Sequence, residues 1–112
     1  MVIISDTAKF IEIKTTFAKH EDAKQFAAKI LGEQLVACIK MQEVESSYPW
    51  EGKIQNGTEY QLCMTTKRGL LKKVEAFIKT NHPYKVPQIV AVPIVHASKE
   101  YGKWINESVG KR

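Results

Sequence analysis

The sequence predicts an α+β domain in which two helices cover one face of a four-stranded antiparallel sheet. The order is β-α-β-β-α-β with a further helix at the C-terminus, the ferredoxin-like sandwich. Three observations predict it. The spacing of apolar residues changes from two to 3.6 and back along the chain. Two helix-like stretches each carry a single apolar stripe, which suits packing on one sheet. Two strand-like stretches follow each other across a short polar link, as in a hairpin.

The chain begins with a predicted strand and helix. Apolar and polar residues alternate over residues 10–17, which predicts a strand with one buried face. Over residues 20–31 apolar side chains recur three and four positions apart, which predicts a helix. Gly32 follows the last of them and is a typical helix end. Residues 1–8 are predicted to form a loose tail.

The middle of the chain predicts a long hairpin. Residues 35–44 are strand-like, and Tyr48 and Trp50 extend the pattern, while the return strand covers residues 59–66. Arms of ten or more residues are too long for two helices to cover, so we expect the distal half to pair with a neighbouring subunit. Two turn signals separate the arms: Glu51-Gly52-Lys53 and Asn56-Gly57.

The second half repeats the helix and strand. Thr66 is predicted to cap a helix that ends before His82-Pro83, because proline cannot continue a helix. Residues 88–96 are β-rich, and Pro93 within them indicates an edge strand or a bulge. Ser98 is predicted to cap the short terminal helix.

Composition narrows the function classes. The 112 residues are 44% hydrophobic and 26% charged, an ordinary globular mix that fits one domain over residues 1–112. The net charge is +5, but 15 of the 17 basic residues are lysines spread along the chain. Base readout and phosphate clamping favour arginine, and residues 59–66 lack the aromatic motif of RNA-recognition domains. The sequence therefore predicts no nucleic-acid partner.

Location and redox state follow from two further patterns. The longest apolar run, residues 89–95, is too short to span a bilayer, and the N-terminus has no basic start followed by an apolar stretch. We therefore expect a cytoplasmic protein with no membrane partner. Cys38 and Cys63 lie in apolar segments and are predicted to be reduced thiols.

The chain carries no motif of an established chemistry. Its three histidines fall in three separate elements, and no nucleophile motif joins a serine or cysteine to a base. Gly69, beside Lys67 and Arg68, marks the one candidate corner for binding an anion.

Two clusters combine large aromatic residues with prolines, at residues 46–54 and 82–87. Together with three further pieces they make the sequence resemble the CutA family, the small proteins named for divalent-cation tolerance. The resemblance runs from about Ile11 to Trp104. Its pieces, in order, are Ala37-Cys38, Ser46-x-Tyr48-x-Trp50-x-Gly52-Lys53-Ile54, Glu59, His82-Pro83-Tyr84-x-Val86-Pro87 and Tyr101-x-x-Trp104.

The resemblance implies a ferredoxin-like protomer in a tight homotrimer, like the nitrogen-regulatory PII proteins. It also implies a link to copper tolerance and metal binding, or in animals to the anchoring of acetylcholinesterase. No established reaction comes with the family, so the chain is expected to bind or signal and not to be an enzyme. Two alternatives stay open: a PII-like sensor of a small anionic ligand in the cleft between subunits, and an enzyme of unknown reaction.

The resemblance also implies functional positions. Of the family's proposed metal ligands only His82 is present, and we expect it to hold copper or another divalent cation weakly, with Cys38 nearby. Thr15 and Asn81 stand where some bacterial members have a cysteine and a second histidine. The ligand cleft and trimer interface would be formed by Tyr48, Trp50, Glu59, Lys67, Tyr84, Tyr101 and Trp104.

Overall fold

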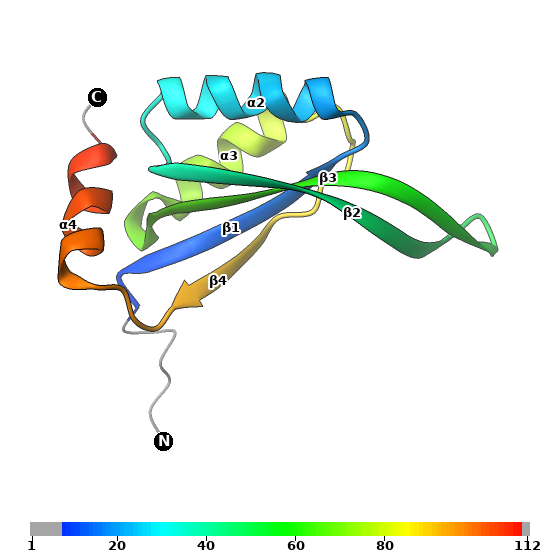
Figure 1. Cartoon of the computed structure of the whole chain (residues 1–112). Helices are drawn as coiled ribbons and strands as arrows, with labels where there is room; N and C mark the ends of the chain where they lie inside the picture. Colours follow the sequence, from blue (N-terminus) through cyan, green and yellow to red (C-terminus); the bar gives the residue numbers. More distant parts are fainter. Residues whose placement is uncertain (1–7, 111–112) are drawn as a thin grey trace.

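Four antiparallel strands form the sheet of the computed structural model, which describes residues 8–110 (Figure 1). Their order across the sheet is β2-β3-β1-β4, as the ferredoxin-like arrangement requires. The α+β fold class is therefore confirmed. The strands are β1 (Phe10–Phe17), β2 (Cys38–Trp50), β3 (Lys53–Lys67) and β4 (Val90–Ile94).

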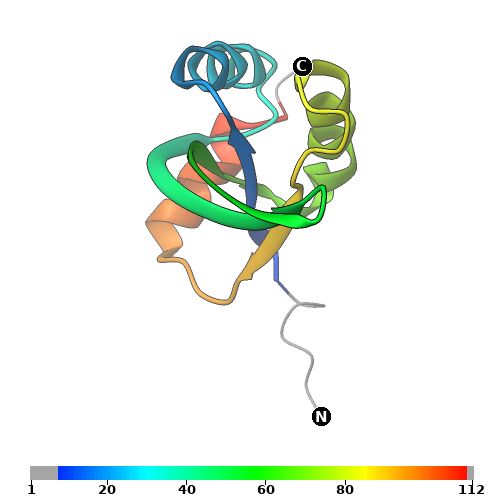
Figure 2. The same cartoon turned by 90° about the vertical axis from the view of Figure 1, so that its right-hand side faces the viewer.

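Two long helices lie over one face of this sheet, and a third lies at one end of it (Figures 1 and 2). The pair on the face is α2 (His20–Gly32) and α3 (Leu71–Asn81), the latter preceded by the short 3-10 helix η1 (Arg68–Leu70). The helix at the end is α4 (Lys99–Ser108). The long hairpin of β2 and β3 extends beyond the helices on the opposite side of the molecule.

The core lies between the sheet and the α2–α3 pair. The odd-numbered side chains of β1 are buried and the even-numbered ones are half-buried, as the alternation predicts. Fully burying one large apolar side chain stabilises the fold by about 1.5–3 kcal/mol, so this one-sided core is what holds the helices on the sheet. Its members are Ile11, Ile13, Phe17, Ala23, Phe26, Ile30, Val36, Leu62, Met64, Val74 and Ile78.

The hairpin is longer than the sequence predicts. The return strand begins at Lys53, and Asn56-Gly57 lies inside the ladder, paired with Ser47 and Ser46. Ser47 Oγ donates a hydrogen bond to Asn56 Oδ1 at 2.6 Å, which adds a cross-strand link at the expected turn. The chain turns only at Glu51-Gly52, where both φ angles are positive (51° and 76°), as a two-residue type I′ hairpin turn needs.

The two predicted helix caps have different outcomes. Ser98 Oγ accepts the Tyr101 N–H at 3.2 Å and caps α4, so that prediction is confirmed. Thr66 does not cap α3, because its hydroxyl donates to the Leu35 carbonyl at 2.6 Å and the chain enters the helix through η1. The hydroxyl instead joins the end of β3 to the segment that precedes β2.

Two boundaries differ from expectation. The fourth strand covers only Val90–Ile94, and within residues 8–110 it pairs with β1 alone, so Pro93 does lie on an edge strand. The predicted tail, residues 1–8, falls mostly outside the described residues, but Ala8 is buried at 9% exposure and belongs to the folded part.

Two buried threonines give a matched test of this core. Both Thr15 and Thr66 are fully buried, but within residues 8–110 the Thr15 hydroxyl has no hydrogen-bond partner, whereas that of Thr66 has one. A buried hydroxyl without a partner costs about 1–3 kcal/mol. We therefore expect Thr15→Val to raise the free energy of unfolding in urea by about 1 kcal/mol and Thr66→Val to lower it by a similar amount. Equal effects of the two substitutions would contradict this account.

Candidate functional site

A cavity of about 600 Å³ opens between the distal half of the hairpin and the loop that follows α3. We call it the hairpin cleft. Its size is within the range of small-molecule sites, and its lining is mostly aromatic and apolar. Its lining includes Tyr48, Trp50, Glu59, Tyr84, Lys85 and Val86.

Strand geometry places the hairpin's contributions on one side. Tyr48 and Trp50 are two residues apart on β2, so their side chains leave the same face. Glu59 lies opposite Val44, which shares that face because it is four residues from Tyr48. The alternation of the strand therefore gathers two aromatic rings and one carboxylate over the cleft.

Tyr84 closes the cleft from the loop side. Its hydroxyl donates a hydrogen bond to Glu59 Oε2 at 3.0 Å, joining the loop to β3. Burial raises the pKa of Tyr84 to about 12, and the hydrogen bond to Glu59 and the charge of that carboxylate act in the same direction. The phenol therefore stays protonated at neutral pH and keeps donating this bond.

His82 anchors the loop that follows α3 to the core. Its ring stacks on Phe17 with the centroids 4.2 Å apart and an angle of 16° between the planes. Nδ1 accepts the Tyr84 N–H at 3.0 Å, so the ring proton belongs on Nε2, which donates to the Thr16 carbonyl at 2.8 Å. Both nitrogens of the neutral ring are therefore used within the fold.

Burial lowers the pKa of His82 below its ordinary value. The hydrogen bond to the Thr16 carbonyl and the nearby carboxylates of Asp22 and Glu59 act against this shift but do not reverse it. His82 is therefore neutral at physiological pH, the form that can both accept from Tyr84 and donate to Thr16.

The predicted metal pair is not brought together. Cys38 lies in the same row of the sheet as Glu12, which is four residues along β1 from Thr16. At 3.3 Å per residue this separates Cys38 from the His82 contact by about 13 Å along the strands alone. Coordination by His82 would also break one of its two hydrogen bonds. Within residues 8–110 no three His, Cys, Asp or Glu side chains are grouped to hold a metal ion.

The two family metal positions do not supply a ligand to this pair either. Thr15 is fully buried in the core. Asn81 donates its side-chain N–H to the Phe77 carbonyl at 2.9 Å, at the C-terminal end of α3. The residues present therefore do not fit copper held by His82 and Cys38.

The two cysteines are free thiols, as predicted. Cys63 Sγ donates to Glu12 Oε2 at 3.3 Å across the sheet. Burial raises the pKa of the Cys63 thiol, and the Glu12 carboxylate adds to the shift through this hydrogen bond and its charge. No local sequence pattern indicates this contact, because it joins residues 51 positions apart.

The structure divides the predicted cleft residues into two groups. Tyr48, Trp50, Glu59 and Tyr84 meet at the hairpin cleft. Lys67 lies eight residues along β3 from Glu59, about 26 Å at 3.3 Å per residue, beside the C-terminal end of α4. Tyr101 and Trp104 stack on each other on α4, with centroids 5.6 Å apart, at that same end.

Four residues of the cleft were not predicted as site residues: Thr16, Lys85, Val86 and Gln88. Lys85 and the neighbouring Val86 lie inside the 82–87 cluster, so the motif itself was a signal for them. Thr16 offers no such signal, since it is an ordinary polar position of a half-buried strand. Gly69 lies at another recess, with Lys9 and Lys72, away from the hairpin cleft.

Comparison with known proteins identifies the family. The family profile described as CutA1 divalent ion tolerance protein matches residues 11–108. The chain belongs to the CutA family. Divalent-cation tolerance protein CutA of Pyrococcus horikoshii is 34% identical over 101 residues, which are 90% of this chain and 99% of that protein.

Plant relatives and solved structures agree with this assignment. Protein CutA, chloroplastic, of Arabidopsis thaliana is 35% identical over 105 residues, 93% of this chain and 58% of that protein, so the chain spans little more than half of it. The crystal structure of CutA1 from Oryza sativa superimposes with a TM-score of 0.89 at 33% identity, covering 94% of this chain and 97% of that one. The CutA1 structure of Pyrococcus horikoshii gives a TM-score of 0.88.

The names of the relatives do not point to one compartment. The Arabidopsis thaliana protein is named chloroplastic, whereas the structure of CutA from Archaeoglobus fulgidus is described as periplasmic. Residues 8–110 contain no helix with the length and hydropathy that crossing a membrane needs.

The buried, neutral His82 predicts a pH dependence of stability. Because its pKa is lower in the fold than the ordinary 6.5, the unfolded chain binds more protons below pH 6.5. Stability is therefore complete above about pH 6.5 and falls as the pH drops from there toward the folded-state pKa, by at most about 1.4 kcal/mol per pH unit. Urea unfolding at pH 7.5 and at pH 5.5 measures the loss.

Two histidine variants locate that effect. His82→Gln should be less stable at pH 7.5 but lose less on going to pH 5.5, because the titrating ring is gone. His96→Gln changes an exposed histidine and should keep the wild-type loss. The same loss in all three proteins would place the dependence elsewhere.

Proposed function

We propose that this CutA-family protein is a homotrimer that binds a ligand in the hairpin cleft. We further propose that it takes part in the response to divalent metal ions by binding or signalling rather than by catalysis, in the cytoplasm. The observation that supports the trimer is the distal half of the hairpin, where β3 has no strand partner on its second edge within residues 8–110. The cleft beside it supports the binding role.

The hairpin leaves backbone groups without partners inside one chain. The ladder between β1 and β3 ends at the Phe17–Tyr60 pair, so in the part of the chain that the structure describes residues 53–59 pair only with β2. The outer edge of β4 is also open within residues 8–110. Proteins normally cover or pair such edges, and a neighbour's β4 is a suitable partner for the hairpin edge.

Apolar side chains support the same arrangement. Trp50 and Ile54, near the hairpin tip, are 60% and 69% exposed, and Val90 on β4 is 43% exposed. Contact between one protomer's hairpin and the next protomer's β4 would cover both patches. A heterologous contact of this kind closes after three copies when it follows a three-fold axis, and it pairs the distal edge of β3 and the outer edge of β4 in every protomer.

The chemistry of the cleft supports binding over catalysis. A general acid or base works best with a pKa near the operating pH. The pKa of Tyr84, about 12, is far above it. The phenol of Tyr84 also donates a hydrogen bond to Glu59, so the two groups hold each other in place as in a fixed recognition surface.

The metal-related part of the proposal rests on the family and not on a metal centre in residues 8–110. The anion-sensor alternative needs cations in the cleft. Among the described residues only Lys85 supplies one to its lining, and Lys67 of the same protomer lies at the other end of β3. That alternative therefore has less support than a cationic ligand.

The trimer is tested by mass. Light scattering coupled to gel filtration should give about three times the protomer mass of 12.7 kDa at micromolar concentration. A folded monomer at that concentration would reject the trimer.

Trp50→Ala tests the part played by the hairpin. Truncating a buried tryptophan costs about 3–5 kcal/mol, so the variant should melt at a lower temperature that depends more steeply on protein concentration. Leu31→Ala is the matched control, since Leu31 is 42% exposed on α2, outside the proposed contact. Its melting temperature should stay close to that of the wild type.

A further inference from the structure

We propose that the hairpin cleft takes a small organic cation, one with a quaternary ammonium or guanidinium group. This rests on the proposed function, because it names the ligand class of the same cleft. It reverses the charge of the ligand that a PII-like sensor would bind.

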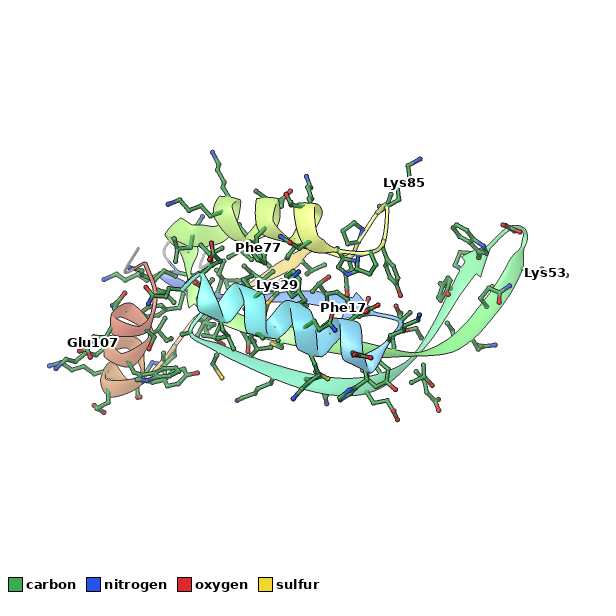
Figure 3. The ribbon with its side chains drawn as sticks, turned by 90° about the horizontal axis from the view of Figure 1, so that it is seen from above. Phe17, Lys29, Lys53, Phe77, Lys85 and Glu107 are labelled. Atoms are coloured by element: carbon green, nitrogen blue, oxygen red, sulfur yellow. The ribbon has the colours of Figure 1, made fainter. Side chains whose placement is uncertain are left out.

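The charge of the cleft favours a cationic ligand. Among its lining residues only Glu59 and Lys85 are charged. Lys85 extends outward from the loop, away from the body of the molecule, as Figure 3 shows. Within residues 8–110 Glu59 forms no salt bridge, and the neutral Tyr84 phenol that it binds leaves its negative charge in place. A ligand in the cleft therefore meets a carboxylate.

The aromatic rings that line the cleft also favour a cationic ligand. Tyr48, Trp50 and Tyr84 all line the same cavity, and the face of an aromatic ring attracts a cation within about 6 Å of its centre. Trp50 is the strongest of the three side chains for this interaction, and it lines the cavity together with the two tyrosines. Aromatic rings around a carboxylate suit an alkylated cation, whose methyl groups also contact Val86.

The same lining disfavours two other classes. Calcium takes six to eight oxygen ligands, and magnesium needs near-octahedral oxygen coordination. The cleft offers one carboxylate that already accepts a hydrogen bond from Tyr84. A small anion would face Glu59 with Lys85 directed away. An organic cation is the class that uses both the rings and the charge.

The test compares two ligands of one shape. Choline and 3,3-dimethyl-1-butanol have the same outline, but only choline is charged. In calorimetric titration of the intact protein, choline should bind at least about tenfold more tightly than the alcohol. The indole N–H resonance that Trp50→Phe removes should shift with choline, which places the ligand in the cleft.

Two carboxylate variants make the assignment specific. Glu59→Gln keeps an acceptor for the Tyr84 hydroxyl but removes the charge, so its choline affinity should fall about tenfold, to that of the alcohol. Glu45→Gln removes an exposed carboxylate of the same hairpin, outside the cleft, and should bind choline like the wild type.

The outcomes separate this inference from the proposed function. Equal affinity for choline and the alcohol, or an unchanged affinity in Glu59→Gln, overturns the organic cation. If acetate or Cu²⁺ shifts the Trp50 resonance and choline does not, the cleft binds ligands but of another class. If no ligand shifts it in a protein that light scattering shows to be trimeric, the neighbour fills the cleft, and ligand binding there is rejected while the trimer stands.

Discussion

The rest of the site depends on the contacts that the ring of His82 makes. It stacks on Phe17 in the core, donates to the Thr16 carbonyl of β1 and accepts the N–H of Tyr84. Tyr84 in turn donates to Glu59 on β3. One neutral imidazole therefore connects the packed half of the molecule to the hairpin cleft, and the loop after α3 has little freedom between these two anchors.

The second constraint is a difference in strand length. β1 has 8 residues and β3 has 15, so the sheet cannot support the distal hairpin. The extra length projects two aromatic rings beyond the helices and leaves an edge unpaired. A cleft and an unpaired edge thus have one origin, which is why a ligand site and an association surface would be adjacent in this fold.

Local patterns predicted most of the fold, and long-range contacts account for what they missed. The alternation over residues 10–17 located β1 correctly, because a strand with one buried face has apolar residues at every second position. Asn56-Gly57 is a strong turn signal, but the cross-strand ladder overrides it. Thr66 has the chemistry of a helix cap, and only the tertiary structure brings the Leu35 carbonyl to its hydroxyl.

The site was predicted less well, for a related reason. A sequence shows that His82 can bind a metal but not that both of its nitrogens already have partners. By contrast, Lys67 and Glu59 fall eight residues apart at the two ends of one predicted strand, so the sequence itself indicates that they are far apart within a protomer.

The same network makes fold and cleft respond together to acid. Protonation of His82 places a hydrogen on Nδ1, which then can no longer accept the Tyr84 N–H. That charged ring would also be buried against Phe17, the reason its pKa is low. Protonation therefore removes a contact that holds the loop with Tyr84 in place. The hydrogen bond from Tyr84 to Glu59 depends on the position of that loop. Loss of stability and loss of cleft geometry thus begin at the same atom, Nδ1 of His82.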